Sequence, residues 1–482
     1  MRWRYIAYAI GSLILFLGIA KIVPLVFGLY YQDQSVRPLL LSIAITVSCG
    51  AVSFFFFRKH RTAYISQREG MAIVALGWTA VGLFGALPFY LSGPHWSFVN
   101  ALFESMSGFT TTGASILTDI EALPKGLLMW RSFIQWLGGM GIIVLSIAIL
   151  PFLGVGGMQL YKAEVPSPVP DKLKPRIRDT AMVLWKVYAL FSLAEVVLLM
   201  LGGMSFFDAL CHAFTTMPTG GFSTWNTSVA HFDSLYIDMV FIFFMIVAGI
   251  NFSLHYQFLR GRTLVFWKDA ECRFFLLAVL LLVMVVTFDI WGPVYDSLAA
   301  ALRYGAFQIV SIVTTTGYAT ADYEQWPAMS QVILLACMFL GASAGSTGGG
   351  MKCLRIMLCF KYCYRELFSL VHPRAVTAIK ISGHTVSEDV MRSVLGFLAL
   401  YIALFGLAAV LLAGMGTDFV TAFGAVAATI GNIGPGFGTV GPMENYTALP
   451  MLGKWLLIWC MLLGRLEIFT VLILLVPEFW RK

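Results

Sequence analysis

The chain has 482 residues, of which 59% are hydrophobic and only 12% are charged. A soluble domain carries roughly 25% charged residues, so this composition excludes an ordinary soluble protein. The formal net charge of +7 does not indicate a nucleic-acid partner, because the basic residues gather in short segments between long apolar runs. That pattern is typical of loops in a membrane protein, and we predict an all-α polytopic membrane fold.

Ten apolar runs are candidates for membrane spans, since a helix needs about 20 apolar residues to cross a bilayer. In chain order they are Tyr5–Leu29, Leu39–Phe57, Met71–Leu91, Trp130–Phe152, Ala181–Leu201, Ile237–Phe258, Phe274–Trp291, Gln331–Ala344, Val390–Leu412 and Trp455–Val476. No small-residue cleavage site follows the first run, so we expect a retained helix and not a signal peptide.

The basic segments test this count of spans. With ten spans they all fall on one side: Arg2 and Arg4, Arg58–Arg68, Lys162–Arg178, Arg260–Arg273, Lys352–Lys380, and Arg481 with Lys482. Because basic loops mark the cytoplasmic side, we predict that both termini are cytoplasmic.

Four similar segments lie on the opposite side. They are Phe98–Ser115, Phe206–Ser223, Leu298–Ala319 and Phe419–Gly438. Each combines about three turns of amphipathic helix, too short to cross, with a stretch that contains glycine. We predict four membrane–pore–membrane repeats after two extra N-terminal spans. The predicted units are 1–69 (extension), 70–157, 158–258, 259–360 and 361–482.

The four segments predict a cation pathway. Non-helical backbone at membrane depth is tolerated only where it lines a cavity. Four such stretches around one axis offer rings of carbonyl oxygens that replace the hydration shell of K⁺. Matching the letters of the four copies aligns Gly113, Gly220, Gly317 and Gly434. Mg²⁺ or Ca²⁺ would call for carboxylates, which these stretches lack.

The eighth run ends in Gly341–Gly350, which contains three consecutive glycines. Glycine costs roughly 1 kcal/mol per residue in a helix, so the helix must break at mid-membrane depth. We predict that this loop lines the pathway and gates it.

Arg465 lies inside the last run, where a charge costs roughly 2.5–3.5 kcal/mol and marks a functional position. We predict that it points into the pathway as an electrostatic barrier to cations. The alternative is a structural contact with Glu467 or with a loop carbonyl, and the two roles are compatible.

Four more polar residues fall within the predicted membrane segments: Glu104, Asp208, His212 and Glu195. They are either members of a proton relay, as a symporter would need, or buried partners that hold the pore loops in place. We favour the second interpretation.

Several motifs resemble the Trk/Ktr/HKT superfamily of K⁺ transport proteins, and most of all its bacterial TrkH/TrkG branch. Besides the four pore segments, they are WLGGMGIIVLSIAILP (Trp136–Pro151), GGMQLYKAE (Gly156–Glu164), GSTGGGMK (Gly345–Lys352), LVHPRAV (Leu370–Val376) and GRLEIFT (Gly464–Thr470). The two extra N-terminal spans also favour this branch.

The resemblance implies where K⁺ binds. Backbone carbonyls of a filter would hold it, and by motif they belong to Thr111, Thr112, Gly113, Pro218, Thr219, Gly220, Thr315, Thr316, Gly317, Asn432, Ile433 and Gly434. Pro218 departs from the expected pattern, since it lacks an N–H. The implied gate consists of Gly345, Ser346, Thr347, Gly348, Gly349, Gly350, Lys352 and Arg465.

The resemblance also implies partners and a location. We expect the pore-forming subunit of a K⁺ uptake system in the bacterial inner membrane. It would form a homodimer controlled by a cytosolic TrkA-like ring that binds nucleotides. A K⁺/H⁺ or K⁺/Na⁺ symporter on the same architecture remains the alternative.

Motifs for other functions fail on inspection. Gly345–Lys352 is similar to a phosphate-binding loop, but Met351 separates glycine from lysine and Cys353 replaces the required Ser/Thr. Gly436-x-Gly438-x-x-Gly441 follows no predicted strand, and the eight cysteines form no Cys-x-x-Cys pair. We therefore predict no enzyme, no organic cofactor and no nucleic-acid partner.

Overall fold

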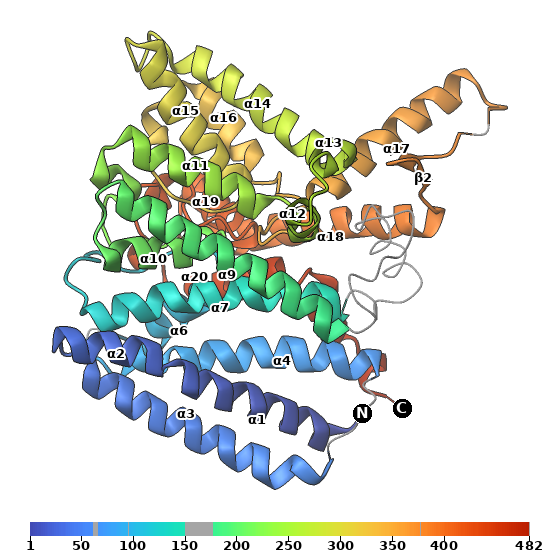
Figure 1. The fold of residues 1–482 in the computed structure, drawn as a ribbon. Coiled ribbons are helices and arrows are strands. Elements are labelled where there is room, and N and C mark those ends of the chain that lie inside the picture. Colours follow the sequence, from blue (N-terminus) through green and yellow to red (C-terminus); the bar gives the residue numbers. More distant parts are fainter. Residues whose placement is uncertain (61–65, 95, 150–176, 376, 482) are drawn as a thin grey trace.

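The computed structural model describes residues 1–60, 66–94, 96–149, 177–375 and 377–481 (Figure 1). Within these described residues, six helices are long and apolar enough to cross a membrane, or up to eight spans if each of two sharply bent helix pairs counts as one. The all-α polytopic prediction is confirmed. The Gly156–Glu164 motif, most of the basic segment Lys162–Arg178 and the predicted boundary at 157 lie outside the described residues.

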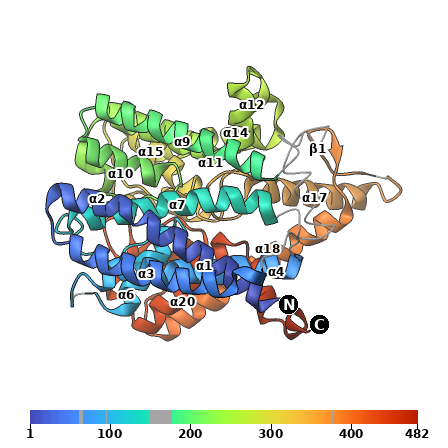
Figure 2. The same cartoon turned by 60° about the horizontal axis from the view of Figure 1, so that its bottom comes forward.

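The N-terminal extension comprises α1 (Trp3–Ala20), α2 (Ile22–Tyr31), α3 (Val36–Phe57) and a 3₁₀ turn at Arg58–His60. The first predicted span is α1 plus α2, with a break at Lys21. The buried Lys21 ammonium donates to Ser42 Oγ (2.6 Å), Thr46 Oγ1 (2.7 Å) and the Phe84 carbonyl (2.9 Å). These bonds tie the extension to α4, and Figures 1 and 2 show α1 and α3 at the edge of the bundle.

The next helices form the first two repeats and the start of the third, to which α13 belongs. They are α4 (Gln67–Gly85), α5 (Leu87–Tyr90), α6 (Phe98–Phe109), α7 (Lys125–Ile149), α9 (Ile177–Leu201), α10 (Phe206–Thr216), α11 (Leu235–Gly249), α12 (Phe252–Leu259) and α13 (Val265–Lys268).

The last two repeats contain one antiparallel hairpin, which pairs Lys380 with Thr385 and Ile381 with His384. Their elements are α14 (Ala270–Ile290), α15 (Leu298–Val313), α16 (Ala328–Cys337), α17 (Cys353–Val371), β1 (Lys380–Ile381), β2 (His384–Thr385), α18 (Glu388–Gly414), α19 (Phe419–Ile430), α20 (Met451–Arg465), α21 (Phe469–Leu472) and α22 (Pro477–Trp480). Short 3₁₀ turns lie at Ser228–Phe232, Tyr323–Gln325, Gly438–Val440, Tyr446–Ala448 and Ile473–Leu475.

Two of the ten predicted spans are sharply bent. The sixth bends by 103° between α11 and α12, and the tenth bends by 112° after α20. At the first bend the Asn251 side chain caps α12 by accepting the Ser253 N–H. At the second, Glu467 takes a positive φ of 53°, which interrupts the helix. The eighth run, Gln331–Ala344, is not a continuous helix either, because α16 ends at Cys337 and a loop at 338–352 follows it.

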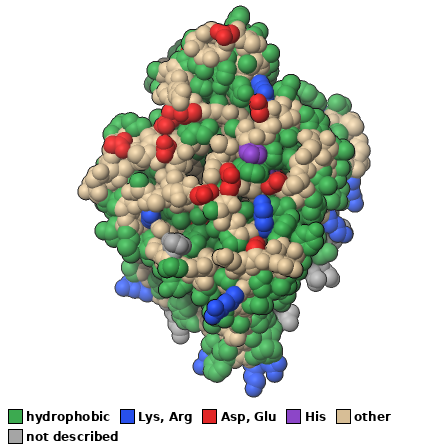
Figure 3. All heavy atoms as spheres, turned by 90° about the vertical axis from the view of Figure 1, so that its left-hand side faces the viewer, with side chains coloured by type: hydrophobic (Ala, Val, Ile, Leu, Met, Phe, Trp, Pro, Cys, Tyr) green, Lys and Arg blue, Asp and Glu red, His purple; other side chains and the backbone are tan. Residues whose placement is uncertain are grey.

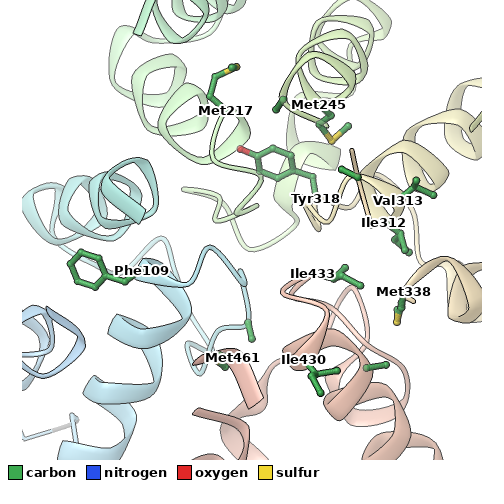
Figure 4. Close-up of a cluster of buried hydrophobic side chains, with 14 of the residues drawn as sticks. Phe109, Met217, Met245, Ile312, Val313, Tyr318, Met338, Ile430, Ile433 and Met461 are labelled. Carbon is green, nitrogen blue, oxygen red and sulfur yellow. The ribbon is translucent and has the colours of Figure 1, made fainter. Parts of the chain in front are cut away.

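Elements from all four repeats meet at the centre of the bundle. Figure 4 shows apolar side chains from them around this centre, among them Phe109, Tyr318, Ile433 and Met461, which are all buried. Many large apolar side chains are instead exposed on the outer helix faces, such as Leu277 on α14. Such a wide apolar surface fits contact with lipid.

The two chain ends lie together at one end of the bundle (Figure 1). The Trp3 and Trp480 rings stack with centroids 5.1 Å apart, and Arg68 donates to the Arg481 carbonyl (2.8 Å). An even number of crossings is consistent with this arrangement.

Candidate functional site

Four short helices, α6, α10, α15 and α19, lead to the centre of the molecule. They have 12, 11, 16 and 12 residues. At 1.5 Å per residue none can cross a hydrocarbon core of about 30 Å. Ser97, Ser205 and Asp418 cap three of them by accepting backbone N–H groups.

The strands that follow these helices share one backbone conformation. Their first residue is not glycine yet has a positive φ, which is uncommon: Thr111 (51°), Thr219 (57°), Thr315 (60°) and Asn432 (53°). The third is glycine with a positive φ: Gly113 (82°), Gly221 (70°), Gly317 (83°) and Gly434 (107°). We call residues 111–113, 219–221, 315–317 and 432–434 the pore strands.

A shared hydrogen bond confirms this register. The N–H of each middle residue donates over 2.8 Å to a carbonyl in the preceding helix: Thr112 to Ser107, Gly220 to Thr215, Thr316 to Ser311 and Ile433 to Ala428.

The register predicted for the second strand is therefore wrong by one residue. Gly221, and not Gly220, takes the place of Gly113, while Pro218 precedes the strand. The missing N–H of Pro218 consequently falls outside the strand. The sequence was ambiguous here because Gly220 and Gly221 are adjacent. In the third copy an aromatic residue, Tyr318, directly follows the key glycine, and Phe222 directly follows Gly221. This match could have identified Gly221 as the equivalent glycine.

The pore strands close into a ring in chain order. A methyl group on each third-position glycine would lie within 2.8 Å of the middle carbonyl oxygen of the next strand. The contacts are Gly113 with Gly220 O (2.2 Å), Gly221 with Thr316 O (2.0 Å), Gly317 with Ile433 O (1.8 Å) and Gly434 with Thr112 O (2.8 Å). Glycine is thus required at this position for two reasons: the positive φ and the close approach of the neighbouring strand.

A hollow lies on the outer side of this ring. It is lined by Gly113, Gly221, Gly317 and Gly434, together with Ser115, Asn226 and Glu444. Figure 3 shows this face, with a hollow near its centre and acidic side chains around it. Negative charge at such a mouth attracts cations.

A buried ion pair between helices α6 and α7 supports the first two pore strands. Arg131 Nε of α7 donates to Glu104 Oε1 of α6 over 2.6 Å, and both side chains are almost fully buried. Glu104 also accepts from Ser115 Oγ (3.0 Å) and the Ile116 N–H (3.1 Å), while Arg131 donates to the Ser223 carbonyl (2.8 Å). The pair therefore holds the outer ends of both strands.

The second strand has further buried support. His212 Nδ1 donates to the Asp208 carbonyl (2.8 Å), and its Nε2 bonds to Ser223 Oγ (3.0 Å). Asp208 accepts from Thr224 Oγ1 (2.7 Å). For Glu104, Asp208 and His212 the structure agrees with buried supporting roles, whereas the fully buried Glu195 on α9 takes no part in these contacts.

The loop at 338–352, which we call the gate loop, lies directly against the inner ends of the pore strands. Gly349 N–H donates to Thr315 Oγ1 (2.7 Å), and Thr347 Oγ1 donates to the carbonyls of Met217 (2.8 Å) and Ala248 (3.1 Å). Ser343 N–H donates to the Gly249 carbonyl (3.0 Å). The loop thus supplies donors to carbonyls left without helical partners where α11 ends.

Side chains from the third and fourth repeats hold the gate loop. Glu271 of α14 accepts from the N–H groups of Ala344 (2.7 Å) and Leu354 (3.1 Å), so it links the middle of the loop to the start of α17. Lys352 donates to the Gly348 carbonyl. Arg465, buried at the end of α20, donates from Nη1 to the Thr347 carbonyl (2.7 Å). Arg465 therefore meets a loop carbonyl, while Glu467 pairs with Arg355 (2.7 Å).

Four short helices, a closed ring of four strands and a loop against one side of this ring define a polytopic membrane protein with a fourfold pseudosymmetric centre. The family model for TrkH, described as a cation transport protein, matches residues 38–482. The chain belongs to this family.

Individual relatives match over their whole length. The chain is 42% identical to the "Trk system potassium uptake protein TrkH" of Salmonella typhimurium, with 100% of both proteins covered. It is 36% identical to TrkG of Escherichia coli, with 99% of each covered. The crystal structure of the potassium transporter TrkH from Vibrio parahaemolyticus superposes with a TM-score of 0.92 at 40% identity, over 100% of both chains. These relatives are named as transport proteins, so the prediction that the chain is not an enzyme is confirmed.

Proposed function

We propose that this chain is the pore-forming subunit of a bacterial K⁺ uptake system. The closed ring of pore strands carries the proposal, because its rings of backbone carbonyls suit a large, weakly hydrated monovalent cation. The relatives named as potassium uptake proteins support the same ion. K⁺ is the transported substrate here, and the proposal requires no organic cofactor.

The proposed K⁺ ligands follow the corrected register. They are the backbone carbonyls of Thr111, Thr112, Gly113, Thr219, Gly220, Gly221, Thr315, Thr316, Gly317, Asn432, Ile433 and Gly434. Gly221 replaces Pro218, whose carbonyl accepts from Thr219 Oγ1 (2.6 Å). Each of the four proposed repeats, 70–157, 158–258, 259–360 and 361–482, would supply one strand. The N-terminal extension, 1–69, would supply none.

We propose further that the gate loop blocks the inner end of the pathway and that Arg465 adds a positive barrier. The direct contact between Gly349 and Thr315 supports the position of the block. The buried guanidinium of Arg465 beside the same loop supports the barrier.

Partners and orientation belong to the same proposal. We infer a homodimer in the inner membrane, with both termini cytoplasmic and a cytosolic nucleotide-binding ring as regulator. Helix α17 projects from the bundle (Figure 1) and exposes Phe360, Tyr364, Leu367 and Leu370, which fits a second copy. The adjacent chain ends, both basic, fit the cytoplasmic side.

A current measurement separates a channel from a symporter. Purified protein in planar bilayers would be held under a fixed K⁺ gradient, first at equal pH and then with a pH gradient. We expect the reversal potential to stay near the K⁺ equilibrium value in both cases. A shift with the pH gradient would establish K⁺/H⁺ coupling instead, and an equivalent Na⁺ gradient tests K⁺/Na⁺ coupling.

A further inference from the structure

The four equivalent residues that begin the pore strands differ in their contacts with the gate loop. Thr111, Thr219, Thr315 and Asn432 each begin a strand with the same backbone conformation. Of these side chains, Thr315 accepts a hydrogen bond from the loop, at 2.7 Å from Gly349 N. Thr219 Oγ1 donates to the Pro218 carbonyl, and Thr111 Oγ1, although fully buried, has no hydrogen-bond partner among the described residues.

The loop backbone at Gly349 is packed closely against the fourth pore strand. A methyl group on Gly349 would lie 2.5 Å from the Gly431 carbonyl oxygen and 2.7 Å from Asn432 Cβ. Gly349 is buried, and its N–H donates to the Thr315 hydroxyl of the third strand. A buried backbone N–H that lost this acceptor would cost free energy comparable to a lost hydrogen bond.

The gate loop makes a second hydrogen bond, beside the second pore strand. Thr347 Oγ1 donates to the carbonyl of Met217, the second residue before the second pore strand. The gate loop is thus joined by hydrogen bonds to two pore-strand segments, and its closed position is matched to their inner ends.

We propose that the Gly349–Thr315 hydrogen bond couples the gate loop to the pore strands, so that Thr315 is a positioning residue for the closed gate. This inference rests on the proposed function, because it assumes that the loop blocks a cation pathway. When the loop leaves, the Thr315 oxygen becomes available to a cation at the inner end of the pore. Cation and loop therefore compete for one oxygen, and by linkage each weakens the binding of the other.

A buried threonine outside the pore strands supplies a matched control. Thr315→Val removes the acceptor but keeps the shape, and Thr315→Ser keeps the hydroxyl. Thr287→Val makes the same change on α14, where the buried Thr287 hydroxyl has no hydrogen-bond partner among the described residues. Each protein would be reconstituted without any regulatory partner, and basal K⁺ flux would be compared by tracer uptake. We expect about tenfold higher basal flux in Thr315→Val, because a buried donor without a partner destabilises the closed state. Thr287→Val should retain low basal flux, and Thr315→Ser should bring the flux back towards the wild-type level because it restores the acceptor.

Equal basal flux in the two valine variants would overturn the coupling, whereas a wild type that passes no K⁺ under any condition would instead overturn the proposed function. Hydrogen exchange on the wild-type protein covers the case in which a valine variant does not fold. Peptides that contain Gly349 should exchange faster in K⁺ than in choline at equal ionic strength. Equal exchange in both cations would contradict the competition.

Discussion

The pore strands and the gate loop are both non-helical, glycine-rich and buried at the centre of the bundle, yet they are held in different ways. Each pore strand is fixed by its own helix and by close packing of its glycine against the next strand. The gate loop occurs once and is held by individual hydrogen bonds from side chains outside the loop, such as those of Glu271 and Arg465. Close packing suits a rigid filter, whereas exchangeable hydrogen bonds suit a segment that moves.

The largest effect should come from crowding the ring of pore strands. Gly317→Ala would place a methyl group 1.8 Å from the Ile433 carbonyl oxygen. We expect at least a hundredfold loss of K⁺ flux, measured by tracer uptake into proteoliposomes. Gly261→Ala is the matched control, because Gly261 has a similar φ of 89° but no atom of another residue near the new methyl group. It should retain flux; equal losses would mean that backbone strain, and not packing, decides the outcome.

The next effect concerns the buried support of the strands. Glu104→Gln removes the negative partner of the buried Arg131. Breaking a buried pair on one side costs about 3–5 kcal/mol, so we expect a clear fall in the thermal unfolding midpoint in detergent. Glu366→Gln removes the carboxylate of a more exposed pair with Arg365 and should leave the midpoint nearly unchanged. An unchanged midpoint in Glu104→Gln would show that the pair does not hold the strands.

A smaller effect is expected at the gate loop, because one exchangeable contact is lost. Arg465→Gln removes the charged donor to the Thr347 carbonyl. A hydrogen bond to a charged group contributes about 1.5–3 kcal/mol, so basal K⁺ flux without a partner should rise about tenfold or more. Arg465→Lys keeps the charge and should restore much of the barrier. Unchanged basal flux in Arg465→Gln would remove Arg465 from the gate.

The smallest effect is a pH dependence at the outer face. Glu324 lies in a loop outside the spans and accepts the Gly438 N–H (2.5 Å), just beyond the fourth pore strand. Burial raises its pKa, with nearby Asp322 and Glu444 acting in the same direction and the Gly438 N–H opposing them. A carboxyl whose pKa is raised by folding binds more protons when folded, so stability falls as pH rises from the unfolded pKa, about 4.3, through the raised folded value.

Glu324→Gln should therefore flatten the slope of the unfolding midpoint as the pH rises above the unfolded pKa. The slope of the wild type and that of the variant would be compared by thermal unfolding in detergent. Identical slopes would assign the pH dependence to other groups.

Much of the fold was predictable because helices that cross a membrane require long apolar runs, which can be recognised in the sequence. The bends after Gly249 and Arg465 were not predictable in this way. Both lie within continuous apolar runs, and the partners that stabilise them come from a loop about a hundred residues away. Helix α17 was missed because we interpreted Lys352–Lys380 only as a basic loop, although Cys353–Val371 is amphipathic.

The site was predictable where the chain repeats itself. Four copies revealed the pore strands, but matching the glycines alone left Gly220 and Gly221 as alternatives. Packing against Thr316 and a hydrogen bond to the preceding helix decide for Gly221 at the third position. The support by Arg131, Glu271 and Gln135, which donates to the Gly220 carbonyl, was also out of reach. These residues lie on long helices, and only the folded chain brings them to the strands.

The most direct test of the four-strand filter is a reversal potential under opposed K⁺ and Na⁺ gradients, for wild type and Gly113→Ser. In this variant the new side chain would meet the Gly220 carbonyl oxygen. We predict a wild-type reversal near the K⁺ equilibrium potential and a shift towards the Na⁺ potential in the variant. A reversal that does not respond to Gly113→Ser, or K⁺ uptake without current, would contradict a filter built from these four strands.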